Sequence, residues 1–312
     1  MRAIIERLKS KLTPQSISLG LDIGTSSLKV IALEKKGKEY TIKKAAYTDL
    51  SPQDDGAIAL KKFVDAQGIS GSQVNISVSG QSVITRYVIL PQMTLSELKS
   101  TMQFEAKQYI PFPLDEIILD CAIVKEKLEN NKMLLVLAAV KKAALEERMN
   151  LIDKVGLSAK IVDVDCFCLA NVFTQLKLPS QGVIPAQDAN ACVLLNIGAR
   201  YTNMIITEGP YLRFSRDIAF GGQAPALQGL TSEINSSLDY YENQSGKPID
   251  KIYVSGGPSL NAGITDSLSR SLNVALTHFE AFSDIPFDVS LAREELKPKA
   301  ALFAVALGLA LR

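Results

Sequence analysis

Two segments of this sequence, one near its start and one in its second half, share the pattern of a strand, a glycine turn and a second strand. They read LDIGTSSLKVIA (residues 21–32) and LNIGARYTNMII (residues 195–206). In each, an apolar stretch ends in a polar residue, isoleucine and glycine, and a second apolar stretch follows. A pattern repeated so far apart predicts two domains of common architecture that face each other across a cleft of nucleotide size.

The size and composition of the chain agree with two globular domains. A chain of 312 residues is too long for one small core. The formal net charge is +1, and no basic stripe with interleaved aromatic residues occurs, so nucleic acid is not an expected partner. The longest apolar run, residues 300–311, is too short to span a bilayer, and no signal peptide precedes it. We therefore expect a soluble cytoplasmic protein without a transmembrane segment.

The first 15 residues differ from the rest. They begin MRAIIERLKSKLT, in which four apolar residues share one helical face and basic residues fill the remainder. Such a leader docks on an anionic membrane or a partner, or it is a loosely ordered start of the chain. The Cys166-x-Cys168 pair is interpreted as two small buried residues in a reducing compartment, because no second cluster completes a metal site.

Strands and helices alternate in mixed order along the chain, which predicts an α/β fold in two halves. Thr94 and Glu97 have capping-box spacing and predict the start of a helix that Pro111 ends. Further helices are expected at 58–67, 144–155, 167–176, 232–243, 261–272 and from Pro298 to the end, with strands at 40–46, 74–78, 83–90, 117–124, 133–140, 161–164 and 251–254. Residues 178–191 carry two prolines and predict a linker.

The repeated turn has a chemical use. Glycine at 24 or 198 lets backbone N–H groups approach a phosphate closely, and Thr25 and Ser26 add hydroxyl donors. Asp22 would repel phosphate by itself, but it holds Mg²⁺ through water. One copy alone predicts only a plain hairpin. Two matching copies favour a common functional ancestry.

A third glycine turn agrees with the first two. The run VSGGPS (residues 254–259) places Gly256 and Gly257 after a predicted strand and before a predicted helix. Such a turn lies against a flat base or a phosphate group. By itself this signal is weak.

Together, the three motifs resemble the two phosphate motifs and the adenosine motif of the superfamily of actin, heat-shock chaperones and sugar kinases. Within it, the run FEAKQYIPFPLDEIILD (residues 104–120) resembles the PilM family of type IV pilus assembly proteins, relatives of the cell-division protein FtsA. Four more segments look like the same family: VSGQSVITRYVILP (78–91), KIVDVDCFCLAN (160–171), RDIAFGG (216–222) and ALFAVALGLALR (301–312).

The resemblance implies an α/β, actin-like (duplicated ribonuclease H-like) two-domain fold with an inserted subdomain of the PilM and FtsA type. The implied boundaries are a leader at 1–15, a first domain at 16–82 with 160–185, an inserted α+β subdomain at 83–159 and a second domain at 186–312. Only about thirty residues separate Gly222 from the predicted strand at Ile252, so the family's fourth subdomain is expected to be truncated near 223–250.

The resemblance also implies a set of site residues. The nucleotide contacts would be Asp22, Gly24, Thr25, Ser26, Lys29, Gly198, Ala199, Gly256 and Gly257. Asp22 would hold Mg²⁺ through water, with Asn196 at the position where the second hairpin of the family usually has aspartate. Asp165 is the candidate carboxylate near the attacking water.

The implied function is that of a cytoplasmic scaffold of type IV pilus assembly, peripheral to the inner membrane through its partners. It would grip the cytoplasmic N-terminal tail of a PilN-like inner-membrane protein, with Phe104, Tyr109 and Ile110 in the tail groove, and would meet other platform proteins. ATP with Mg²⁺ is expected to bind weakly or not at all, because Asn196 lacks a charge and a truncated wall encloses the nucleotide poorly.

Three alternatives stay open at this point. The first is an active Mg-ATP-binding ATPase or a small-molecule kinase of the same superfamily, which would need a catalytic base beside its acceptor. The second is FtsA itself, and the third is a metabolic binding protein without catalysis.

Overall fold

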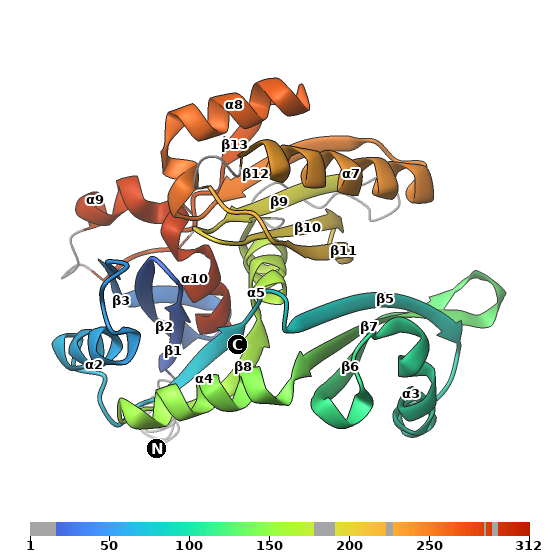
Figure 1. Cartoon of the computed structure of the whole chain (residues 1–312), viewed down its shortest axis with the longest axis horizontal. Coiled ribbons are helices and arrows are strands. Elements are labelled where there is room, and N and C mark those ends of the chain that lie inside the picture. The colour runs from blue at the N-terminus through green and yellow to red at the C-terminus, as the bar shows by residue number, and fades with distance from the viewer. Residues whose placement is uncertain (1–16, 178–190, 223–226, 284, 289–292) are drawn as a thin grey trace, which may run out of the picture.

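The computed structural model describes residues 17–177, 191–222, 227–283, 285–288 and 293–312 (Figure 1). The predicted leader at 1–15 and all but the last residue of the predicted linker at 178–191 lie outside these ranges. Within them, the strands form two five-stranded sheets and one three-stranded sheet. None of the described helices combines the length and the apolar character needed to cross a membrane.

The two five-stranded sheets are built to one plan. The first has the order β3-β2-β1-β4-β8 and the second the order β11-β10-β9-β12-β13. Each begins with an antiparallel hairpin, and a later strand pairs in parallel with the hairpin's first strand. The strands of the first sheet are β1 (Ile17–Ile23), β2 (Ser27–Lys36), β3 (Glu39–Asp49), β4 (Gln73–Val78) and β8 (Ser158–Val164). Those of the second are β9 (Ala191–Ile197), β10 (Thr202–Glu208), β11 (Tyr211–Ile218), β12 (Ile249–Ser255) and β13 (Leu276–His278).

The repeated sequence pattern is therefore a repeat of register as well as of sheet order. Leu21 pairs with Val30 in the first hairpin, and Leu195 pairs with Met204 in the second. Each turn is closed by the same backbone bond, from glycine N–H to the carbonyl oxygen three residues later. This bond measures 3.1 Å at Gly24 and 2.8 Å at Gly198. The predicted duplicated α/β fold is confirmed.

Helices cover the outer faces of both sheets (Figure 1). On the first sheet, α2 (Gly56–Ala66) and α4 (Lys142–Lys154) bury Leu60 and Ile152 against Leu21. On the second sheet, α7 (Leu227–Ser245) and α8 (Ala262–Leu272) bury Ile234 and Leu268. Between Gly222 and β12, the described residues form the single helix α7.

The inserted unit is a three-stranded antiparallel sheet with one helix on a face. Its strands are β5 (Val83–Pro91), β6 (Ile117–Leu128) and β7 (Lys132–Lys141), in the order β5-β7-β6, and the helix is α3 (Leu95–Tyr109). The predicted capping box begins α3: the Glu97 N–H donates to Thr94 Oγ1 (3.3 Å), and the Thr94 N–H donates to Glu97 Oε2 (2.7 Å). Shorter elements are η1 (Leu114–Glu116), η2 (Glu129–Asn131), η3 (Phe173–Lys177), η4 (Gly257–Leu260), α9 (Arg293–Leu296) and η5 (Lys297–Phe303).

Two helices, α5 (Asp165–Val172) and α10 (Ala304–Ala310), lie between the two large sheets (Figure 1). All seven residues of α10 are buried. The backbone of α10 approaches those of β1 and α5 so closely that Gly20 and Gly308 leave no room for a side chain. A Cβ on Gly20 would lie 2.1 Å from the Ala306 carbonyl oxygen, and one on Gly308 would lie 2.2 Å from the Cys168 carbonyl oxygen. Glycine at these positions is what lets α10 pack against both β1 and α5.

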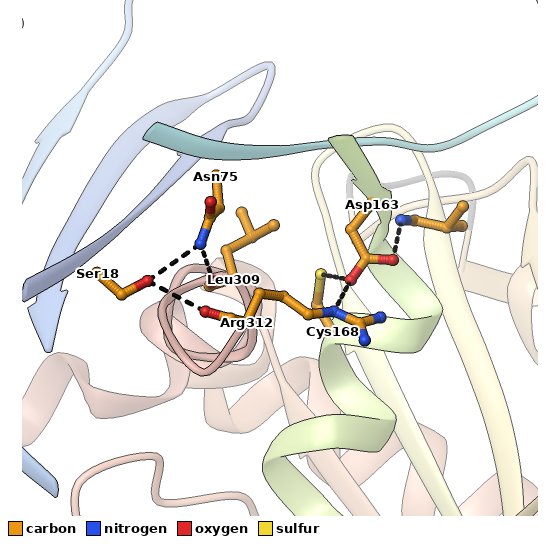
Figure 2. Close-up of polar contacts among 7 residues, drawn as sticks. Ser18, Asn75, Asp163, Cys168, Leu309 and Arg312 are labelled. Atoms are coloured by element: carbon orange, nitrogen blue, oxygen red, sulfur yellow. Dashed lines mark hydrogen bonds and ion pairs between the residues drawn. The ribbon is translucent and has the colours of Figure 1, made fainter. Parts of the chain in front are cut away.

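Polar contacts fasten the end of α10 to the first sheet (Figure 2). Asn75 on β4 donates from Nδ2 to the Leu309 carbonyl oxygen (2.8 Å) and to Ser18 Oγ (3.1 Å). The Arg312 guanidinium pairs with the Asp163 carboxylate on β8, which also accepts the Cys168 thiol (3.6 Å). The Leu309 carbonyl oxygen also accepts the Arg312 backbone N–H (3.2 Å), so the Asn75 amide adds a second hydrogen bond at the end of the helix.

The glycine contact between α10 and α5 predicts a large loss of stability on substitution. Gly308→Ala should lower the free energy of unfolding by ~3 kcal/mol or more, because both backbones must move apart in a close-packed interior. Chemical denaturation of the purified protein measures this.

The matched control is Gly56→Ala at the start of α2, where a Cβ would meet no atom within 4 Å. That variant should be neutral or stabilising by up to ~1 kcal/mol. Equal effects at the two positions would contradict the close-contact interpretation.

Candidate functional site

A hollow of about 250 Å³ lies between the two hairpin turns. It is lined by every nucleotide, metal and catalytic candidate named from the sequence: Asp22, Gly24, Thr25, Ser26, Lys29, Asp165, Asn196, Gly198, Ala199, Gly256 and Gly257. Residues that the sequence analysis did not single out also line it, among them Ser77, Ser79, Arg148, Arg200, Tyr201 and Asn203. We call this hollow the cleft.

Three of the glycines that line the cleft are required by close backbone approach. A Cβ on Gly24 would lie 3.0 Å from the Ser27 carbonyl oxygen, and one on Gly198 would lie 2.7 Å from that of Tyr201. Gly256 has a φ of +89°, and its Cβ would lie 2.1 Å from the Ile197 carbonyl oxygen. The third turn therefore rests directly on the end of β9, and its glycine N–H donates to the Ala301 carbonyl oxygen (2.8 Å) in η5.

Asp22 and Lys29 face each other across the first hairpin and form an ion pair. The Lys29 Nζ lies 3.0 Å from Asp22 Oδ2, and the two side chains are only 11% and 14% exposed. Lys29 Nζ also donates to the Ser27 carbonyl oxygen (3.3 Å). The sequence predicted both residues as nucleotide contacts, but it did not reveal that the ammonium group neutralises the carboxylate. A partly desolvated pair of this kind holds both side chains in place.

Asp165 stands in the first turn of α5, at the floor of the cleft. Desolvation, helped by the negative charge of Asp22, raises the pKa of Asp165 to about 7, although hydrogen bonds from Ser77 and Ser79 oppose the shift. Its carboxyl group is therefore partly protonated at neutral pH. The structure thus gives the candidate catalytic carboxylate an environment that favours its neutral form.

Asn196 takes part in a hydrogen-bond network at both ends of its amide. Its Nδ2 donates to Asn203 Oδ1 (2.9 Å), and its Oδ1 accepts from the Ser255 hydroxyl (3.1 Å). Asn203 Nδ2 in turn donates to Asp217 Oδ1 (2.8 Å). Sequence reasoning missed Asn203 and Asp217. The sequence does not distinguish Asn203, because it follows another polar residue, Thr202; only the structure shows that it is 4% exposed.

A second hollow, of about 290 Å³, lies beside the cleft at the junction of the first sheet and the inserted unit. We call it the groove. It is lined by Ile23, Gly24, Thr25, Val78, Ser79, Ser82, Val83, Ala144, Glu147, Arg148 and Leu151. Five of these residues, namely Ile23, Gly24, Thr25, Ser79 and Arg148, also line the cleft. Arg148 donates to the Ile23 carbonyl oxygen (3.2 Å), so the two hollows share a wall.

The three partner-binding candidates from the sequence lie elsewhere, on and below α3. Phe104 is 74% exposed, Tyr109 is half-buried, and Ile110 is 3% exposed in the core of the inserted unit. None of them lines the groove. The reason is the helical period: Leu98, Met102 and Ala106 face the sheet, which turns Phe104 to the opposite side.

A family described as "Type IV pilus assembly protein PilM" matches residues 20–226 and 223–312. The chain is similar to a solved "PilM-PilN type IV pilus biogenesis complex", with 25% identity, a TM-score of 0.81, and 96% of this chain and 99% of that chain covered.

Two more distant structures share the fold. The ethanolamine utilization protein EutJ from Carboxydothermus hydrogenoformans is 12% identical with a TM-score of 0.52, covering 96% of this chain and 90% of its own. A Bacteroides thetaiotaomicron protein with an actin-like ATPase fold is 12% identical with a TM-score of 0.50, covering 85% and 91%.

The raised pKa of Asp165 predicts a pH-dependent stability. Its folded-state pKa of about 7 lies above the ordinary 3.8, so between these values the folded protein holds a proton that the unfolded chain has released. The stability associated with Asp165 is therefore full at low pH and falls as the pH rises toward 7. Asp165→Asn should remove this loss. The free energy of unfolding of the variant should therefore rise relative to that of the wild type by at most about 1.4 kcal/mol per pH unit up to pH 7.

Denaturation measured at several values between pH 5 and 8 tests this. Asp239→Asn, an exposed carboxylate on α7, is the matched control for the change of charge. A constant difference between Asp165→Asn and the wild type over this range would contradict the prediction.

Proposed function

This chain belongs to the type IV pilus assembly protein PilM family, and we propose from that premise that it is a scaffold which binds the cytoplasmic N-terminal tail of a PilN-like inner-membrane protein. The similar solved structure is a complex of PilM with PilN. In this role the protein resides in the cytoplasm, peripheral to the inner membrane through its partner, and meets other proteins of the assembly platform.

The observation that carries the proposal is the groove. Apolar side chains of Ile23, Val78, Val83 and Leu151 line it, and Ser82, Glu147 and Arg148 add polar groups. Such a lining suits a short extended segment whose apolar side chains are buried while its backbone meets polar groups. The groove draws on the first sheet, α4 and the inserted unit together. A bound tail would therefore fix the inserted unit against the first domain.

The cleft suits a nucleotide less well. The glycine turns and the hydroxyl groups of Thr25 and Ser26 fit a phosphate. The acidic groups fit Mg²⁺ poorly, because Asp22 is paired with Lys29 and Asn196 is neutral with both ends of its amide engaged. A nucleotide would have to break these interactions before a metal ion could be held. We infer that binding of ATP with Mg²⁺ is weak and that Asp165 supports little hydrolysis.

The groove predicts which substitutions abolish tail binding. A synthetic peptide that copies the cytoplasmic end of the PilN-like protein should bind the full chain in calorimetry. Ala144→Glu, which places a charged side chain in the groove, should weaken binding by tenfold or more, about 1.4 kcal/mol. Ala143→Glu is the matched control, because Ala143 is the exposed neighbour outside the groove.

The same assay tests the assignment made from the sequence. Phe104→Ala and Tyr109→Ala should leave peptide affinity within about twofold of the wild type if the tail lies in the groove. A loss of affinity at Phe104 with none at Ala144 would place the tail on α3 and overturn the assignment to the groove.

The engaged side chains of Asp22 and Asn196 in the cleft predict weak binding and slow hydrolysis of ATP. Titration with Mg-ATP should give a dissociation constant of about 0.1 mM or weaker, with little phosphate release over hours. The measurement is calorimetry together with a phosphate-release assay on the same preparation. Tight binding with steady turnover would instead favour the alternative, an active Mg-ATP-binding ATPase.

A further inference from the structure

A chain of hydrogen bonds crosses the second sheet from the cleft to the first domain. It joins Ser255 at the end of β12, Asn196 on β9, Asn203 on β10 and Asp217 on β11, and it ends at the backbone N–H of Gly80 in the β4–β5 turn. These four strands are neighbours in the sheet. We call this set the relay.

Every side-chain bond between Ser255 and Asp217 is donated toward Asp217. The Ser255 hydroxyl donates to Asn196 Oδ1 (3.1 Å), and Asn196 Nδ2 donates to Asn203 Oδ1 (2.9 Å). Asn203 Nδ2 donates to Asp217 Oδ1 (2.8 Å), and the Gly80 N–H donates to Asp217 Oδ2 (2.6 Å). Asp217 is thus the common acceptor, and each amide must both accept and donate.

The direction of these bonds explains why residue 196 is an asparagine and not an aspartate. A carboxylate there would set its oxygen against Asn203 Oδ1, which also can only accept. If the Asn203 amide turned over, its Oδ1 would face Asp217 instead. Either arrangement leaves one repulsive pair inside a part of the protein where Asn203 and Ser255 are 4% and 2% exposed.

The far end of the relay holds the wall of the groove. Gly80 has a φ of +83°, and its turn carries Ser79, Ser82 and Val83, which line the groove. The Tyr201 ring lies 3.5 Å from where a Cβ on Gly80 would be, so the second hairpin turn also contacts this turn. Two residues into β5, Thr85 Oγ1 and Ser215 Oγ lie 2.6 Å apart.

We propose that Asn196, Asn203 and Asp217 are positioning residues for the partner site: through Gly80 they fix the groove wall in the geometry that receives the tail. This proposal rests on the proposed function of the groove. It assigns Asn196 a positive role in place of a lost metal ligand. None of these three residues lines the groove.

The direction of the relay offers a reversal experiment. Asn196→Asp alone leaves two acceptors facing each other, whichever way the Asn203 amide lies. Asp217→Asn alone can be accommodated, because both amides can turn over and the Ser255 hydroxyl can then accept from Asn196 Nδ2. In the double variant N196D/D217N, the Asn203 amide turns over, and every neighbouring pair is again a donor and an acceptor. The number of charges also returns to that of the wild type.

The readouts are hydrogen exchange of residues 78–83 and affinity for the tail peptide. Asn196→Asp should exchange at least fivefold faster at this turn and bind the peptide at least fivefold more weakly, whereas Asp217→Asn should have a smaller effect on both readouts. The double variant should return to within about twofold of the wild type in both. The matched control is N243D with D239N, which makes the same exchange on the exposed surface of α7 and should change neither readout.

The outcomes separate the two proposals. An Asn196→Asp variant without effect, or a double variant as impaired as Asn196→Asp, would overturn the relay. If Asn196→Asp fails to fold, recovery of folding and slow exchange in the double variant still supports the relay, and failure of the double variant overturns it. If the wild type does not bind the peptide, the proposed function falls, and hydrogen exchange alone decides the relay.

Discussion

The contact between α10 and α5 at Gly308 sets the spacing on which the rest of the molecule depends. Because no Cβ intervenes, the two helices fill the space between the sheets as one layer. Asp165 begins α5 and so takes its place at the floor of the cleft, while η5, just before α10, receives the N–H of Gly256. The positions of Asp165 and Gly256 in the cleft therefore depend on how α10 packs against α5.

Much of this architecture could be predicted from the sequence, because the hairpins carry their own signals. The glycine turns, the register and the capping box at Thr94 depend on residues close together in the chain. The domain boundaries and the role of each cleft residue stay predictions. What the sequence could not show were contacts between distant segments, such as Asp217 with Gly80, 137 residues apart. The resemblance implied that Ile110 lies in the tail groove, and only the packing of α3 reveals that it belongs to the core of the inserted unit.

The two copies of the hairpin illustrate how a duplicated element acquires different chemistry within one backbone shape. In the first copy, a lysine on the facing strand neutralises the carboxylate. In the second, an amide replaces the carboxylate and links neighbouring strands. In both copies the polar side chain at this position is held by an internal interaction, which fixes its orientation in the cleft. A scaffold gains from such rigidity, whereas phosphoryl transfer needs acidic groups free to bind a cation.

The packing of α10 against β1 affects how the protein folds during its synthesis on the ribosome. Ser18 contacts Arg312 across 294 residues of sequence, and the backbone of Gly20 lies against residues 306–310. The first strand therefore leaves the ribosome roughly 15–60 s before its partner helix exists, at ~5–20 residues per second. During that interval, one face of the nascent first domain lacks its apolar cover. Chaperone binding to the unfinished chain would be expected at this face, and its release would coincide with the arrival of the last helix.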